Sequence, residues 1–248
     1  MVQYAWISFE FLRCSSFVMR LYMWEGELDK VIETSKYFQH KKWWRIENLS
    51  TYSHVPASSS VKLWNGILFA GYNTDMKKIF DAASVVSNQK KFRYETAYFN
   101  GLYTEDADDY RKKLMSGTAN DNRSLRWLYE TETMETRIIP VIRLSEVYLM
   151  MVEAYAETDF EKAVTMLYDY RRIARNAKRV LNFNSKAELT EFLKREWARE
   201  FQSEGQKFFF NKRHGFKVYQ GEGKAEYDFD ANKCWVLPQP LNEDSYRL

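Results

Sequence analysis

The fold is decided by two nearby stretches, IIPVIRLSEVYLMMVEAYAETDFEKAVTMLYDYRRIARN at 138–176 and SKAELTEFLKREWAREFQSEGQKFFFNKRHG at 185–215. In the first stretch, apolar residues recur at three- and four-residue steps, the spacing of one face of an α-helix. They predict a helix over 142–157 whose inward face carries Leu144, Val147, Tyr148, Met151, Ala154 and Tyr155. Pro140 lies just before this face, where its missing N–H is no loss.

Two further helices are predicted in the same region. Asp159 interrupts the first pattern and can cap the next helix, whose expected inward residues are Phe160, Ala163, Val164, Leu167, Tyr168 and Ile173. Ser185 with Glu188 is a capping-box pattern, and it opens a third helix with the stripe Leu189, Phe192, Leu193, Trp197 and Phe201. We expect Gly205 to end that helix in a left-handed turn. The result is an antiparallel helix pair with a third helix packed on it.

The beginning of the chain repeats this pattern. Apolar and aromatic residues dominate 3–24 and predict a well-buried helix, which Gly26 ends before a second helix over 28–39. The run LDKVI at 28–32 aligns with FEKAV at 160–164, as in tetratricopeptide-like hairpins. Each hairpin leaves an apolar face that a neighbour must cover, so we expect the two hairpins to stack.

These patterns predict a single, mainly α-helical domain of tetratricopeptide-like hairpins with a long loop-rich insert. Its expected parts are a first hairpin at 1–40, the insert at 41–137, a second hairpin with its packed helix at 138–215, and an extended segment at 216–248. Within the insert we expect a loop at 42–60, a helix at 75–86 capped by Thr74, a hairpin or extended segment at 92–103, a helix at 108–114 and an extended segment at 126–139.

Composition excludes several classes of protein. The chain has 37 Lys and Arg against 34 Asp and Glu, and they are scattered, whereas a nucleic-acid-binding protein usually carries a basic stripe. No apolar run reaches the roughly 18 residues of a membrane-spanning helix, and no signal peptide is visible. Cys14 follows an arginine, which makes it a poor lipid-attachment site. Cys14 and Cys234 are expected to be separate free thiols, with a single bridge as the alternative.

Few residues suggest catalysis. His40, His54 and His214 lack metal-ligand spacing, and neither a phosphate-binding loop nor a nucleophile elbow is present, so we expect no metal and no cofactor. Glu196 and Glu200 lie one turn apart on an arginine-rich helix. Because buried charges must be paired, we expect a partly buried ion-pair network that ties the third helix to the first, made of Arg143, Glu146, Glu196 and Glu200. The basic run Arg171, Arg172, Arg175, Lys178 and Arg179 is expected to be a solvated helix end.

Several motifs resemble one known family. The run IPVIRLSEVYL at 139–149, followed by Glu196, by REF at 199–201 and by EG at 204–205, resembles the C-terminal part of SusD/RagB-type proteins. These are surface lipoproteins of the outer membrane of Bacteroidetes. Two features depart from the family pattern. FFFNKRHG at 208–215 replaces an Asp-Leu-x-Arg-Trp pattern, and the lipoprotein signal and first helices of the family are expected to lie outside this sequence.

Aromatic residues are the best candidates for ligand contacts, since they make up 17% of the chain. A flat, exposed ring can cover the C–H face of a pyranose, and in SusD-type proteins loop aromatics build the glycan site. The resemblance therefore implies a glycan site in the insert, with the candidates Trp43, Trp44, Tyr52, Trp64 and Tyr72. The alternative is that these rings pack against the helical hairpins. Trp6, Trp24 and Trp197 lie on helical stripes and are expected in the core.

The resemblance implies a function without turnover. The chain is expected to bind an oligosaccharide at the extracellular face of the outer membrane and to pass it to a SusC-like TonB-dependent transporter. Its contact with the membrane would be a lipid anchor that this chain does not include. A helical-repeat scaffold that binds a peptide or a protein is the alternative, and a helical glycosidase with two carboxylates across a cleft is the third.

Overall fold

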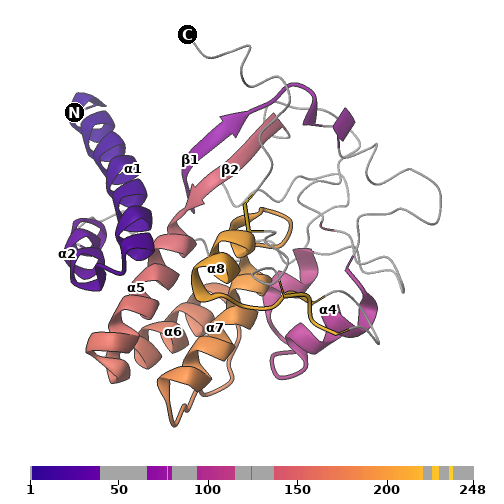
Figure 1. Cartoon of the computed structure of the whole chain (residues 1–248). Coiled ribbons are helices and arrows are strands. Elements are labelled where there is room, and N and C mark those ends of the chain that lie inside the picture. Colours follow the sequence, from indigo (N-terminus) through magenta and orange to yellow (C-terminus); the bar gives the residue numbers. More distant parts are fainter. Residues whose placement is uncertain are drawn as a thin grey trace.

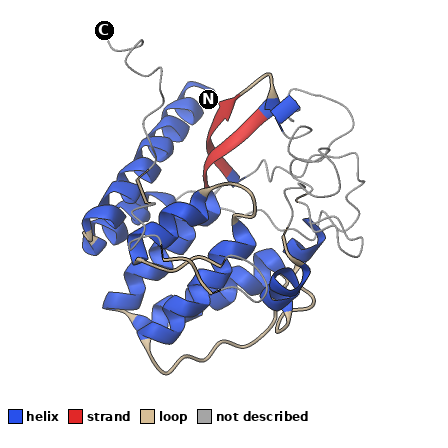
Figure 2. Ribbon diagram, turned by 45° about the vertical axis from the view of Figure 1, so that its right-hand side comes forward, coloured by secondary structure: helices blue, strands red, loops and turns tan. Residues whose placement is uncertain are grey.

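The computed structural model describes residues 2–39, 66–76, 78–79, 94–114, 124, 137–219, 225–228 and 235–236. The described part is mainly helical with one two-stranded sheet, which confirms the predicted fold class (Figures 1 and 2). In chain order the elements are α1 (Val2–Glu25), α2 (Leu28–Gln39), β1 (Ile67–Tyr72), α4 (Thr96–Tyr103), the 3₁₀-helix η3 (Tyr110–Leu114), β2 (Ile138–Arg143), α5 (Leu144–Thr158), α6 (Phe160–Arg175), α7 (Lys186–Glu200) and α8 (Gln206–His214).

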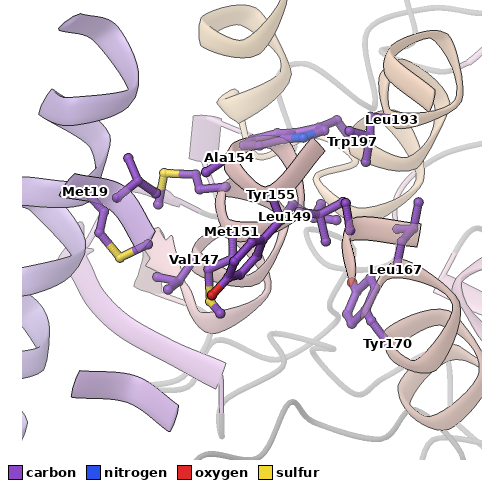
Figure 3. Packing of buried hydrophobic residues seen from close by; sticks show 14 of the residues in the cluster. Met19, Val147, Leu149, Met151, Ala154, Tyr155, Leu167, Tyr170, Leu193 and Trp197 are labelled. Carbon is purple, nitrogen blue, oxygen red and sulfur yellow. The ribbon is translucent and has the colours of Figure 1, made fainter. Parts of the chain in front are cut away.

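Helix α5 is the centre of the core. Twelve of its 15 residues are buried, because α1, α2, α6 and α7 all pack against it. Figure 3 shows Met19 reaching α5 from α1, and Trp197 reaching it from the opposite side. The predicted one-sided stripe is therefore incomplete, since Leu149 and Val152 are buried as well. A helix that is apolar on every side is one that other helices enclose.

The two predicted hairpins form and stack. Gly26, with φ of 75°, makes the left-handed turn between α1 and α2, and α2 packs on α5. The carboxylate of Asp159 accepts a hydrogen bond from the Lys162 N–H at 3.1 Å, which confirms the cap of α6. The Ser185 hydroxyl likewise accepts from the Glu188 N–H at 3.2 Å and caps α7.

The third helix ends earlier than expected, and a fourth follows it. Helix α7 stops at Glu200, and Gly205, with φ of 88°, is the residue that starts α8. Helix α8 was not predicted, because its run of three phenylalanines shows no clear helical period. Phe210 of that run is buried and stacks on Trp197, with 4.8 Å between ring centroids. Phe209 is exposed.

Strand β2 corrects the predicted start of α5. Residues 138–143 pair antiparallel with β1, so Pro140 lies in a strand opposite Ala70 and the helix begins at Leu144. A two-stranded sheet has only edge strands, and proline is tolerated there because it needs no partner for an N–H.

Two predictions for the insert have different outcomes. The expectation of a hairpin or extended segment at 92–103 is wrong, because Thr96–Tyr103 is helix α4. Phe99, Leu102 and Tyr103 follow helical spacing and are buried together. The helix expected at 108–114 is present as the short η3. The loop at 42–60 and most of the helix expected at 75–86 lie outside the described residues.

Several expected core residues are at the surface. Trp24 on α1 is 44% exposed and Ile173 on α6 is 56% exposed, so both predictions of burial are wrong. The part of α1 whose side chains are described, residues 11–25, is not well buried either, because Phe17 and Leu21 also face outward. Trp197 is buried as expected. Among the described helices, none combines the length and the apolar character that crossing a membrane requires.

Replacing the Ser185 cap should destabilise the protein. Alanine cannot accept the hydrogen bond from the Glu188 N–H, so Ser185→Ala should lower the free energy of unfolding by about 1 kcal/mol. Ser185→Asn is the matched control, because asparagine also caps helices and should change stability little. Urea denaturation followed by circular dichroism measures both. Equal stability of the alanine and asparagine variants would contradict this account of the cap.

Candidate functional site

The predicted loop aromatics are only partly placed by the structure. Trp43, Trp44, Tyr52 and Trp64 lie outside the described residues. Tyr72 ends strand β1 and is 55% exposed. Its hydroxyl accepts a hydrogen bond from Nη1 of Arg137 at 3.2 Å. The ring of Tyr72 is therefore accessible to a ligand.

The residues expected to form an ion-pair network belong to a larger buried charge cluster. It contains five arginines and five carboxylates, each side chain at most 3% exposed. Its members are Asp106, Asp109, Arg111, Arg143, Arg171, Arg175, Glu196, Arg199, Glu200 and Glu204. Equal numbers of opposite charges make the cluster neutral, which is the condition for burying so many ions.

Glu200 is the acceptor that joins the most elements. One of its oxygens lies 2.8 Å from Nη1 of Arg143 and 2.8 Å from Nη2 of Arg175. The other accepts from the hydroxyl of Tyr170 at 2.6 Å and from Nε of Arg175 at 2.9 Å. Strand β2, helix α6 and helix α7 therefore meet at this one carboxylate.

Glu196 makes a second junction one turn earlier. Its carboxylate lies 2.6 Å from Arg111 of η3, 3.1 Å from Arg171 of α6 and 3.1 Å from Arg199 of its own helix. Arg199 in turn donates from Nε to the carbonyl of Leu102 at 2.6 Å. The insert elements α4 and η3 are thereby attached to α7.

Glu146 does not join this cluster. It pairs with Arg20 of α1 at 2.6 Å and so ties α5 to the first hairpin. Burial raises the pKa of Glu146, and Arg20 offsets part of that effect. Of the four residues expected in one network, Arg143 and Glu200 are in direct contact, Glu196 shares their cluster, and Glu146 lies apart.

The arginines of α6 were assigned to the wrong environment. Arg171 and Arg175 are buried, whereas a solvated helix end was expected. Both extend the four-residue series of buried Ala163 and Leu167, and this spacing is the feature that could have identified them. Arg172, the next residue after Arg171, is exposed and pairs with Asp169.

The two cluster glutamates are poorly suited to acid–base catalysis. Burial alone would raise the pKa of Glu196, but Arg111, Arg171 and Arg199 lower it to about 2. Burial opposes ionisation of Glu200 too, yet Arg175 and Arg143 hold its pKa well below the ordinary value. A glycosidase acid needs a raised pKa and access to its substrate. These two carboxylates have neither.

A cleft of about 310 Å³, lined mostly by charged residues and tyrosines, opens beside the cluster, between α4, α7 and α8. We call it the tyrosine–lysine cleft, and its main lining residues are Tyr98, Lys194, Arg195, Lys207, Asn211 and Tyr219. The rings of Tyr98 and Tyr219 stack with centroids 4.8 Å apart and an interplanar angle of 14°. Tyr94 extends the stack on the other side of Tyr98. Stacked rings beside polar side chains are a surface on which a sugar can lie.

A second cleft, of about 280 Å³, lies between α1, α5 and α8. Its walls are mostly apolar and include the exposed Phe17, Leu21, Trp24 and Phe209. Its two arginines, Arg20 and Arg213, are already paired with Glu146 and Glu153. This cleft offers few hydrogen-bonding groups to a saccharide.

The comparisons with known proteins identify the family. Residues 59–233, more than half of the chain, match the SusD family. The chain belongs to the SusD family. This result confirms the resemblance seen in the motifs at 139–149 and 199–205. A search of curated proteins found no match.

Solved structures share the fold of this SusD-family chain. A SusD-like carbohydrate-binding protein from Bacteroides vulgatus has a TM-score of 0.62 at 19% identity, covering 82% of this chain and 45% of its own. A SusD superfamily protein from Bacteroides thetaiotaomicron has a TM-score of 0.61 at 20% sequence identity, and the match covers 88% of this chain and 53% of that protein. A SusD superfamily protein from Bacteroides fragilis has a TM-score of 0.60 at 18% sequence identity, and the match covers 92% of this chain and 53% of that protein. The chain thus spans about half the length of the solved structures it matches.

Removing the charge of Glu200 should strongly destabilise the fold. Glu200→Gln leaves Arg143 and Arg175 buried without their carboxylate, and breaking a buried ion pair in this way costs about 3–5 kcal/mol. Glu157→Gln is the matched control, because its pair with Lys186 is exposed on both sides and should contribute at most about 1 kcal/mol. Urea denaturation measures both variants. Similar losses in the two would contradict the structural role of Glu200.

Proposed function

We propose that this SusD-family chain binds an oligosaccharide without covalent chemistry at the extracellular face of the outer membrane. The family match over 59–233 carries this proposal. A structural neighbour described as a SusD-like carbohydrate-binding protein supports the ligand class. The bound saccharide would then pass to a SusC-like TonB-dependent transporter, with a lipid anchor as the attachment to the membrane.

The insert aromatics are the proposed glycan-binding residues. In the sequence, these candidates fall between the two helical hairpins: Trp43, Trp44, Tyr52, Trp64 and Tyr72. Tyr72 has the exposure that a stacking platform requires. A row of such rings would cover the apolar faces of successive sugars while polar neighbours bind the hydroxyls.

The charge cluster favours capture over hydrolysis. Glu196 and Glu200 are buried against arginines, which lower the pKa of both carboxyl groups. They stabilise the scaffold that carries the ligand site. We therefore propose that the saccharide leaves the protein chemically unchanged.

A peptide or protein ligand is the alternative function. The apolar cleft between α1 and α8, with Leu21, Trp24 and Phe209 exposed at its walls, favours this alternative. Apolar peptide side chains fit such a cleft better than a sugar does. The two functions therefore predict ligands at different places on the molecule.

A glycan titration separates the two functions. Isothermal titration calorimetry against a panel of host and dietary oligosaccharides should give saturable binding of at least one of them. The double variant Trp43→Ala/Trp44→Ala should weaken that binding by about tenfold or more, equivalent to ~1.4 kcal/mol, with helicity unchanged. Trp24→Ala is the control, because it removes an exposed tryptophan of the apolar cleft.

Three outcomes would contradict the proposal. The first is a folded protein that binds no oligosaccharide. The second is a loss of affinity in Trp24→Ala while the double variant keeps its affinity. The third is cleavage of the bound saccharide. Chromatography of the recovered ligand reports the last of these.

A further inference from the structure

We infer that the tyrosine–lysine cleft is a separate binding site for an acidic sugar, one whose ring carries a carboxylate or sulfate group. The acidic group would contact Lys207, a sugar hydroxyl would contact Asn211, and Tyr219 would support the ring. This inference rests on the proposed function, because it takes a saccharide to be the ligand. It adds a second binding site on the protein and requires that the saccharide bound there carry a negative charge.

The first observation concerns the ammonium group of Lys207. This side chain is only partly exposed, and Nζ donates to the hydroxyl of Tyr98 at 2.7 Å. The neighbouring cations each have a carboxylate within 4 Å, namely Glu226 for Lys194, Glu105 for Arg195 and Asp228 for Lys217. Within the described ranges, no carboxylate lies that close to Lys207. An anionic ligand would supply the missing countercharge.

The second observation concerns Asn211, one helical turn after Lys207 on α8. Residues four apart share a helix face, and both side chains line the cleft. Asn211 is only 4% exposed, and its Oδ1 has no hydrogen-bond partner in the part of the chain that the structure describes. A buried acceptor left unpaired is costly. A hydroxyl group of a sugar is a donor that fits it.

The lining charges favour an anion over a neutral ligand. Four cations, Lys194, Arg195, Lys207 and Lys217, face two carboxylates, Glu191 and Glu226. Three of these cations are paired with carboxylates, so Lys207 is the lining cation whose charge an anionic ligand would neutralise. A monosaccharide unit fits its volume of about 310 Å³.

Aromatic stacking gives the site its preference for sugars over free anions. Tyr219 stacks on Tyr98, lines the cleft and is 37% exposed, so a sugar ring can contact its exposed part. A free anion has no apolar face to place on it. Burial raises the pKa of Tyr98 to about 12, so its hydroxyl stays protonated and neutral beside Lys207.

The protonation state of Lys207 should control affinity. Burial and the nearby Lys194 lower its pKa to about 8. The other groups that face Lys207 are Tyr98 of α4, Glu191 of α7, and Lys217, Tyr219 and Glu226 beyond α8. Because only the charged ammonium attracts the acid, affinity is present below pH 8 and should fall as the pH rises through that value.

The test compares acidic trisaccharides with their neutral methyl esters. Calorimetry at pH 7 should show that at least one of trigalacturonate, triglucuronate and trimannuronate binds tenfold or more tightly than its ester. Lys207→Gln should reduce the acid to the affinity of the ester. Lys207→Arg should keep the preference and remove the weakening between pH 7 and 9. Lys186→Gln removes a charge elsewhere on α7. It should change neither the preference for the acid over its ester nor the weakening of binding between pH 7 and 9.

Several outcomes overturn the inference. Equal affinity for all three acids and their esters would do so, and so would a preference that survives in Lys207→Gln. Competition by free acetate or sulfate at the same concentration as the trisaccharide would show an anion site without sugar recognition. Binding of neutral oligosaccharides in these cases would leave the proposed function standing. Absence of any saccharide binding would refute both.

Discussion

The structure depends on two glutamates placed one turn apart on α7. Glu196 and Glu200 collect arginines from η3, β2 and α6 into a neutral, fully buried cluster. A single missing partner would leave a charge in the interior, and the penalty for that exceeds the contribution of most single contacts. The buried ion pairs therefore hold elements that are far apart in the sequence in one arrangement. Hydrophobic packing alone would allow more alternative arrangements.

This constraint explains how a long insert can carry a defined surface. Arg111 and Arg199 attach η3 and α4 to α7. Helix α4 in turn places Tyr98 beside Lys207 of α8. The cleft is thus assembled from α4 and α7, which the Arg199–Leu102 hydrogen bond joins, and from α8, which packs on α7 through Phe210 and Trp197.

The sequence predicted the parts that local physical chemistry determines. Asp159 and Ser185 cap their helices because their side chains reach the first free N–H groups. Other features depend on partners distant in the sequence. Pro140 gave no indication of its pairing with a strand 70 residues earlier, and Arg171 carries a charge that normally indicates solvent. The tyrosine–lysine cleft escaped prediction for the same reason, since residues of α4 and α8 meet only in the folded chain.

We propose that this SusD-family protein holds an intact saccharide on its aromatic and polar surfaces. A crystal structure of the protein with the tightest-binding oligosaccharide tests it most directly. The account predicts an uncleaved ligand, with rings against the insert aromatics or Tyr219 and with any acidic group at Lys207. A ligand seated in the apolar cleft between α1 and α8, or one cleaved beside a carboxylate, would contradict it.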